Sequence, residues 1–352
     1  MPIQNVMLVA GFNYENAKNP VFLERCTNRM ARMLNSRSTS GELVFTLFDV
    51  GGGLIRQSSV DPKTKNRSWI ELSRFTPVTT ANYSSFVTGQ ENEFDQNSLG
   101  TMSITNVYDF VKDIGAGPNK GTLLELSFFS HGWSGGPILV NSFESKAQTT
   151  GRDPADKDAR LWKDFVTPYM DATELAKFRA AFAATGIVWT WGCAFYRPAN
   201  IILSRLFKTS KYSSTPPSAI KGTDKFTLNF SEDTTKPRGK ADFDDIVNDL
   251  LPGGKLSGRS YSITATFRTI KNAFKTLVAD TYSTQVAAAT GAKTFGALPG
   301  TSADYEKSVR LPLMVIPTRK PPYDDNFTPN LKFYKTHLGV QIDPENRGYG
   351  AF

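Results

Sequence analysis

Apolar and polar residues alternate along the chain in a pattern that predicts strands separated by helices. Short apolar runs of the length of buried strands lie at residues 6–10, 43–48, 123–129 and 186–193. Between them, apolar residues recur at helical spacing at residues 22–34, 104–114 and 161–184. Strands alternating with helices are typical of a mostly parallel sheet with helices on both faces. We therefore predict an α/β fold.

The rest of the chain carries a weaker version of the same pattern. Polar residues with room for a hairpin fill 56–100, and a second polar segment at about 208–258 is expected to be an insertion with a hairpin at 226–230. Further elements are expected as helices at 198–207 and 267–289 and strands at 293–298 and 311–316. We predict one domain over residues 1–317, and an irregular C-terminal tail, residues 318–352, that packs on or extends from it.

Charge and composition exclude several classes of protein. The 352-residue chain has a net charge of +8, but its basic residues are spread along the sequence without interleaved aromatic residues, so we expect no nucleic-acid partner. No apolar run approaches the roughly 18 residues of a membrane span. The N-terminal residues lack the pattern of a signal peptide. We expect a soluble, cytoplasmic protein without membrane contact, although export by a route that needs no signal peptide stays open.

Histidine and cysteine are rare, which limits metal chemistry and draws attention to two positions. The chain has two histidines and two cysteines, with no spacing typical of a metal site, so we expect no metal and no cofactor. His131 and Cys193 each close one of the apolar runs. Because the carboxyl ends of parallel strands meet at one edge of a sheet, we expect the two side chains to lie together.

This pair suggests nucleophilic catalysis. A nearby imidazole can take the proton of a thiol during attack and return it to the leaving amine. Gly132 follows the candidate base and Gly192 precedes the candidate nucleophile, so the backbone can approach a substrate closely. The amides of Gly132 and Cys193 are the candidate oxyanion donors.

These residues carry a resemblance to a known group of enzymes. An apolar strand ending in His131-Gly132, followed after one helix by an apolar strand ending in Gly192-Cys193, resembles the caspase-like cysteine peptidases: caspases, metacaspases, legumain, gingipain, clostripain and separase. The resemblance covers about residues 3–207, and 267–298. It implies a three-layer caspase-like fold, a peptide substrate, His131 as base, Cys193 as nucleophile, Gly132 as oxyanion donor and a thioester acyl-enzyme.

One residue departs from the pattern of that family. Trp191 stands two residues before the cysteine, where caspases have Gln and metacaspases have Asp. In the family this position faces the pocket for the residue before the scissile bond. We therefore expect Trp191 to form an apolar wall there, or to occlude the pocket, and we expect no strict preference for Asp or for Arg and Lys.

Other residues at the same edge are candidates for substrate contact. Asn13 follows the first predicted strand and Asp49 follows the second. Together with Trp191 and Gly192, we expect them to line the substrate cleft.

A competing motif overlaps the histidine segment. Residues 132–136 read Gly-Trp-Ser-Gly-Gly and match G-x-S-x-G, the nucleophile elbow of α/β-hydrolases. Ser134 with His337 would then make a serine esterase or lipase. Against this, Pro137 follows the motif and the next residues have an extended rather than a helical pattern. An inactive caspase-like binding module is the third alternative.

Overall fold

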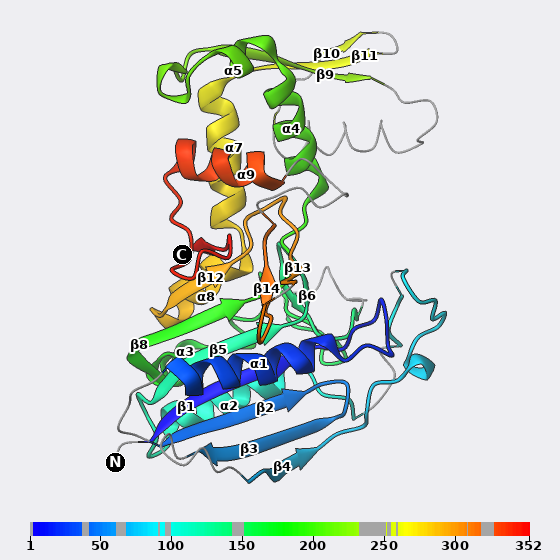
Figure 1. Cartoon of the computed structure of the whole chain (residues 1–352), viewed down its shortest axis with the longest axis vertical. Helices are drawn as coiled ribbons and strands as arrows, with labels where there is room; N and C mark the ends of the chain where they lie inside the picture. The colour runs from blue at the N-terminus through cyan, green and yellow to red at the C-terminus, as the bar shows by residue number, and fades with distance from the viewer. Residues whose placement is uncertain are drawn as a thin grey trace.

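The predicted α/β architecture is confirmed. A computed structural model describes residues 3–36, 42–60, 68–90, 92–95, 100–142, 151–231, 251, 255–257, 260–307, 309–317 and 327–352. An eight-stranded, mostly parallel sheet runs through the molecule in the order β15-β12-β8-β5-β1-β2-β3-β4 (Figure 1). The parallel strands are β1 (Gln4–Ala10), β2 (Leu43–Asp49), β5 (Leu123–Phe129), β8 (Phe182–Thr190) and β12 (Lys293–Gly296). The antiparallel strands at the two edges are β3 (Leu54–Val60), β4 (Ile70–Arg74) and β15 (Gly350–Ala351).

Helices cover both faces of this sheet because its strands send alternate side chains into two separate cores. In β1, Val6 and Leu8 belong to one core, while Met7 and Val9 belong to the other. The first core is completed by α1 (Val21–Ser36), α4 (Arg197–Lys208), α7 (Phe267–Ala279) and α9 (Phe327–Phe333). The second is completed by α2 (Ile104–Ala116), α3 (Ala172–Ala180) and α8 (Tyr282–Thr290). Figure 1 shows α1 in front of the sheet and α2 behind it.

The polar insertion forms a small sheet of its own. Its three antiparallel strands are β9 (Lys225–Ser231), β10 (Lys255–Ser257) and β11 (Ser260–Thr266), in the order β10-β11-β9. They lie at the end of the molecule opposite β3 and β4 (Figure 1). Short elements complete the fold: η1 (Thr80–Asn82), β6 (His131–Trp133), β7 (Gly136–Ile138), α5 (Ser210–Ser214), η2 (Pro217–Ala219), β13 (Asp304–Tyr305), β14 (Met314–Val315) and η4 (Tyr334–Leu338).

Several expected elements differ from the structure. The hairpin expected at 226–230 is a single strand, β9, which pairs with β11. The helix expected over 161–184 is confined to α3, where Asp171 caps the first turn by accepting hydrogen bonds from the amides of Thr173 and Glu174. The helix expected over 267–289 is two helices, because the Thr281 side chain caps a new one, α8. The tail expected to be irregular contains α9, the π-helical turn η4 and the edge strand β15.

In the part of the chain that the structure describes, no helix combines the length and apolar character of a membrane span.

Candidate active site

Strands β5 and β8 lie side by side and stay in register up to their carboxyl ends. Phe128 is opposite Thr190, and the Trp191 amide donates to the Phe128 carbonyl oxygen at 2.9 Å. Beyond the regular strands, the two segments continue together, because Trp133 and Phe195 form a parallel bridge. The structure thus places His131 and Cys193 on neighbouring segments at the carboxyl ends of the parallel strands.

The two glycines allow this close approach of main chains. A Cβ atom on Gly132 would lie 2.8 Å from the Cys193 carbonyl oxygen and 3.2 Å from its nitrogen. A Cβ atom on Gly192 would lie 2.9 Å from the Ser130 carbonyl oxygen. Gly132 and Gly192 are therefore needed for the packing of the two segments, whatever further role their amides have.

Asn13 and two aromatic rings hold His131 in place. Its Nε2 lies 3.0 Å from Oδ1 of Asn13, whose amide nitrogen donates to the Asn19 carbonyl oxygen. Because Asn13 Oδ1 can only accept, Nε2 carries the proton and Nδ1 keeps a free lone pair. The imidazole also packs on Tyr14 and Phe22, with ring centroids 4.3 and 5.0 Å away. Burial lowers the pKa of His131 from 6.5 to about 4, so the ring is neutral at pH 7.

Cys193 lies against the segment that follows β12. Its Sγ accepts a hydrogen bond from the Ala303 amide at 3.2 Å. Burial raises the pKa of the thiol to about 11, although the Ala303 amide and the Ser302 hydroxyl oppose this effect. The Glu15 carboxylate also raises that pKa, and it lies 3.7 Å from Nδ1 of His131. One carboxylate therefore acts on both members of the candidate dyad.

Two predicted substrate-binding residues have other roles. Asn13 is 8% exposed and orients His131. Asp49 accepts a hydrogen bond from the Gly52 amide at 2.9 Å and pairs with Arg56 at 3.5 Å, so its described contacts stabilise the turn after β2.

Trp191 is a core residue rather than an exposed pocket wall. It is 0% exposed and stacks on Trp189 and Phe129. Its Nε1 donates to the Ser127 hydroxyl at 3.2 Å, and its carbonyl oxygen accepts from the Tyr349 hydroxyl at 2.7 Å. The expectation that Trp191 forms an apolar wall in contact with substrate is therefore wrong, because the ring is fully buried, while the alternative that the pocket is occluded stays a prediction.

The structure does not assemble the serine hydrolase site. Ser134 lies in the turn of the β6–β7 hairpin, where Trp133 pairs with Gly136, and no helix follows it directly. His337 lies in η4, with its Nε2 2.9 Å from the Tyr212 hydroxyl and its ring packed on Phe267 and Phe333. A nucleophile elbow needs a strand-turn-helix, so the motif match is a coincidence of residues in a hairpin.

Sequence reasoning missed the residues that surround the dyad from other segments. Ala303 reaches Cys193 because residues 194 and 301 form an antiparallel bridge. Tyr305 packs beside Phe22, at 6.4 Å between ring centroids. Nothing in the sequence around residues 301–305 signals these contacts, because they depend on how the chain returns after β12. Among the described residues, no group of three or more His, Cys, Asp or Glu side chains is placed to hold a metal ion.

Comparison with known proteins gives one weak similarity. No family model matches the chain, and no curated protein matches it. Among solved structures, the chain is similar to a secreted C11 cysteine protease from Bacteroides thetaiotaomicron, determined by X-ray diffraction in complex with an irreversible peptide inhibitor. The identity is 11% and the TM-score 0.27, over 58% of this chain and 46% of that chain. The match thus spans less than half of the length of that protease.

Proposed function

We propose that the chain is a cysteine peptidase in which Cys193 attacks the peptide bond and His131 acts as the base. The observation that carries this proposal is the register of β5 and β8, which brings a histidine and a cysteine to segments that leave adjacent strands, with a glycine next to each of them in the chain. The same order of strands and residues is the one that the resemblance to caspase-like peptidases predicts.

The first half of the reaction uses a neutral dyad. As Sγ attacks the carbonyl carbon, the thiol proton moves to Nδ1 of His131, which the Asn13 contact at Nε2 leaves free. The amides of Gly132 and Cys193 donate to the oxyanion. When the carbon–nitrogen bond breaks, the imidazolium returns its proton to the departing amine, and a thioester remains on Cys193.

The second half regenerates the thiol. His131 takes a proton from a water molecule while the oxygen of that water attacks the thioester carbon. The carbon–sulfur bond then breaks, the carboxylic acid product leaves, and the imidazolium gives its proton back to sulfur. The hydrogen bond from the Ala303 amide to Sγ stabilises the negative charge that sulfur carries at this stage.

Replacing the nucleophile tests the proposal. Cys193→Ala is expected to lower kcat/KM for peptide hydrolysis by about a thousandfold or more, because the covalent step has no substitute. Activity is measured by mass spectrometry on a mixed peptide library. Cys26→Ala is the matched control, since Cys26 is the other thiol and lies buried in α1. Full hydrolysis by Cys193→Ala would contradict the proposal.

Chemical labelling separates this function from its alternatives. Alkylation of Cys193 should abolish hydrolysis, and a fluorophosphonate should leave Ser134 unmodified. A serine hydrolase would show the reverse. A binding module would bind peptides without cleaving any of them.

A further inference from the structure

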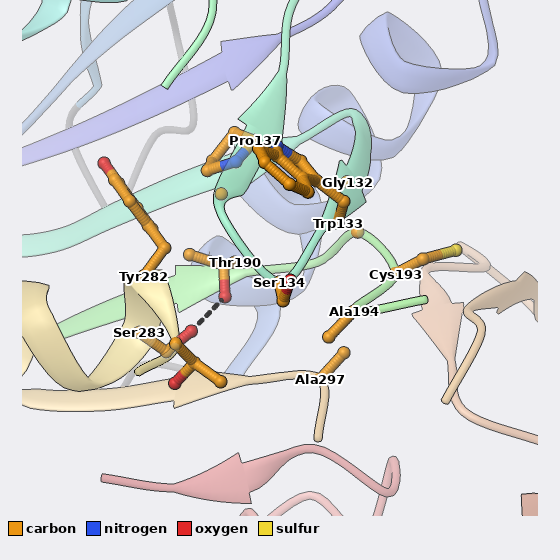
Figure 2. Close-up of a pocket in the computed structure, with 13 residues that line it drawn as sticks. Gly132, Trp133, Ser134, Pro137, Thr190, Cys193, Ala194, Tyr282, Ser283 and Ala297 are labelled. Carbon is orange, nitrogen blue, oxygen red and sulfur yellow. Dashed lines mark hydrogen bonds between the residues drawn. The ribbon is translucent and has the colours of Figure 1, made fainter. Parts of the chain in front are cut away.

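A narrow pocket lies beside the main chain of the proposed dyad. It is enclosed by the β6–β7 hairpin, the end of β8, the N-terminus of α8 and Ala297 after β12 (Figure 2). The Tyr282 amide donates to the Ser134 carbonyl oxygen at 3.0 Å and so ties the hairpin to α8. Gly132 and Cys193 line the pocket with their main chain, while the Cys193 sulfur points away from it (Figure 2).

The pocket has an uncharged lining. None of the described residues that line it carries a charged side chain. Two of its hydroxyl groups bind each other: Thr190 Oγ1 and Ser283 Oγ are 2.8 Å apart, and Thr190 Oγ1 also donates to the Phe295 carbonyl oxygen at 3.2 Å. A charged substrate side chain would therefore lose its hydration without gaining a side chain of opposite charge.

The size of the pocket limits what enters it. The centre of a water-sized group can move within only about 20 Å³ of the pocket, so the pocket holds a group of a few heavy atoms. A short aliphatic side chain fits this space, and a long side chain does not.

Two exposed aromatic residues lie at the edge of the sheet just past the dyad. Trp133 is 45% exposed and Phe195 is 51% exposed, and they are paired by the bridge between their segments. Trp133 also lines the pocket. Its indole covers Gly135 so closely that a Cβ atom there would lie 2.3 Å from a ring carbon. Exposed apolar surface of this kind, next to a candidate active site, marks a place for a binding partner.

We propose that the pocket and its exposed aromatic neighbours, Trp133 and Phe195, bind an uncharged, short aliphatic side chain of the peptide substrate, beside the bond that is cleaved. This rests on the proposed peptidase function. The occupant is a substrate side chain because Gly132 and Cys193 belong both to the pocket lining and to the proposed oxyanion site, so a bound peptide passes the mouth of the pocket. The chain therefore selects Ala or Val at this position over Asp, Arg or Lys.

Kinetics with a matched peptide series test the subsite in the active protein. The peptides differ in one residue, Ala, Val, Asp or Arg, on either side of the scissile bond. We expect kcat/KM at least about tenfold higher for Ala and Val, which corresponds to about 1.4 kcal/mol. Trp133→Ala should raise KM for these two peptides several-fold and leave kcat nearly unchanged. Trp162→Ala is the control, because Trp162 is 62% exposed and does not line the pocket.

A second variant displaces the ring without removing it. Gly135→Ala places a methyl group against the indole of Trp133, so it should reproduce the rise in KM. Equal rates for all four peptides, or unchanged KM in both Trp133→Ala and Gly135→Ala, would overturn the subsite while leaving the peptidase function intact.

A binding measurement tests the subsite independently of the proposed peptidase activity. Calorimetric titration of the same peptides into full-length Cys193→Ala protein needs no turnover. Preferred binding of the Ala and Val peptides, lost in the double variant Cys193→Ala/Trp133→Ala, supports the subsite even if the wild-type chain cleaves nothing. Binding without any preference among the peptides overturns it.

Discussion

Buried polar groups have different kinds of partners in the middle of strands β5 and β8 and at the carboxyl ends of these strands. In the middle, Glu125 receives two hydrogen bonds from Arg29, at 2.7 and 2.8 Å, and a third from Ser127. Glu345 contacts the same guanidinium at 2.6 Å. At the ends, hydrogen bonds come from neutral groups: His131 contacts the Asn13 side chain and Cys193 a main-chain amide, while the half-exposed Glu15 carboxylate lies 3.7 Å from His131 Nδ1. Burial with a charged partner preserves charge, while burial with neutral partners removes it.

This difference fits a structural role for the middle of the strands and the proposed catalytic role for the residues at their ends. The ion pair of Arg29 and Glu125 is permanent: burial alone would lower the pKa of the guanidinium, but the carboxylates of Glu125 and Glu345 raise it, so Arg29 stays charged. The pKa values of His131, about 4, and of Cys193, about 11, mean that the resting dyad carries no charge at pH 7. In the proposed reaction, charge would appear there only while a proton is being transferred.

Breaking the ion pair should have the largest effect. Glu125→Gln is expected to lower the free energy of unfolding by about 3 to 5 kcal/mol, because it leaves a buried guanidinium short of one negative partner. Urea unfolding measures this. The control is Glu71→Gln, which breaks the exposed pair with Arg74 and should cost less than about 1 kcal/mol. Similar losses of unfolding free energy in both variants would contradict a special role for the buried ion pair.

The neutral state of His131 predicts a pH-dependent stability. Its folded-state pKa of about 4 lies below the ordinary 6.5, so the unfolded chain takes up a proton first as the pH falls. Stability is therefore lost between pH 6.5 and about pH 4, by about 3 kcal/mol in total, and this contribution is fully present above pH 6.5. His131→Gln should lack this loss when denaturant unfolding of the two proteins is compared across that range. Parallel pH profiles would show that folding leaves the pKa of His131 unchanged, which would contradict this prediction.

The smallest effect concerns the orientation of the imidazole. Asn13→Ala should lower kcat by about tenfold to a hundredfold with little change in KM, because the ring is no longer fixed for proton transfer. Asn13→Asp keeps an acceptor for Nε2 and should restore much of the rate. It should also move the acidic limb of the kcat profile to higher pH, since a carboxylate favours the imidazolium. Asp49→Asn, at the same sheet edge, should leave kcat unchanged; an equal loss there would contradict a specific role for Asn13.

The sequence predicted the central strands well because burial on both faces leaves an apolar run with few alternatives. The runs at 43–48 and 123–129 correspond closely to β2 and β5, and the parallel pairing of β5 with β8 puts His131 and Cys193 on neighbouring segments, as expected. Helix boundaries were harder. The division at Thr281 depends on one capping side chain inside an otherwise helical pattern.

The surroundings of the dyad could not be predicted from local patterns. Asn13 was expected at the right edge, but its contact with His131 depends on a side-chain orientation that spacing does not fix. Trp191 was interpreted through its position before the cysteine, whereas its surroundings are set by α1 and by the C-terminal segment. Residues 302–305 reach the site only through the return of the chain after β12.

The Tyr349 hydroxyl bonded to the Trp191 carbonyl has a consequence for the synthesis of the chain. The stacked rings of Trp189 and Trp191 also meet the ring of Tyr349, at 5.9 and 5.4 Å between centroids. On the ribosome the N-terminal strands emerge first, so the sheet can begin to assemble early. These two indole rings, however, lack their contacts with Tyr349 until residues 349–351 have been translated. A nascent chain therefore exposes aromatic surface beside the proposed active site, and chaperones that bind exposed aromatic surface would bind there.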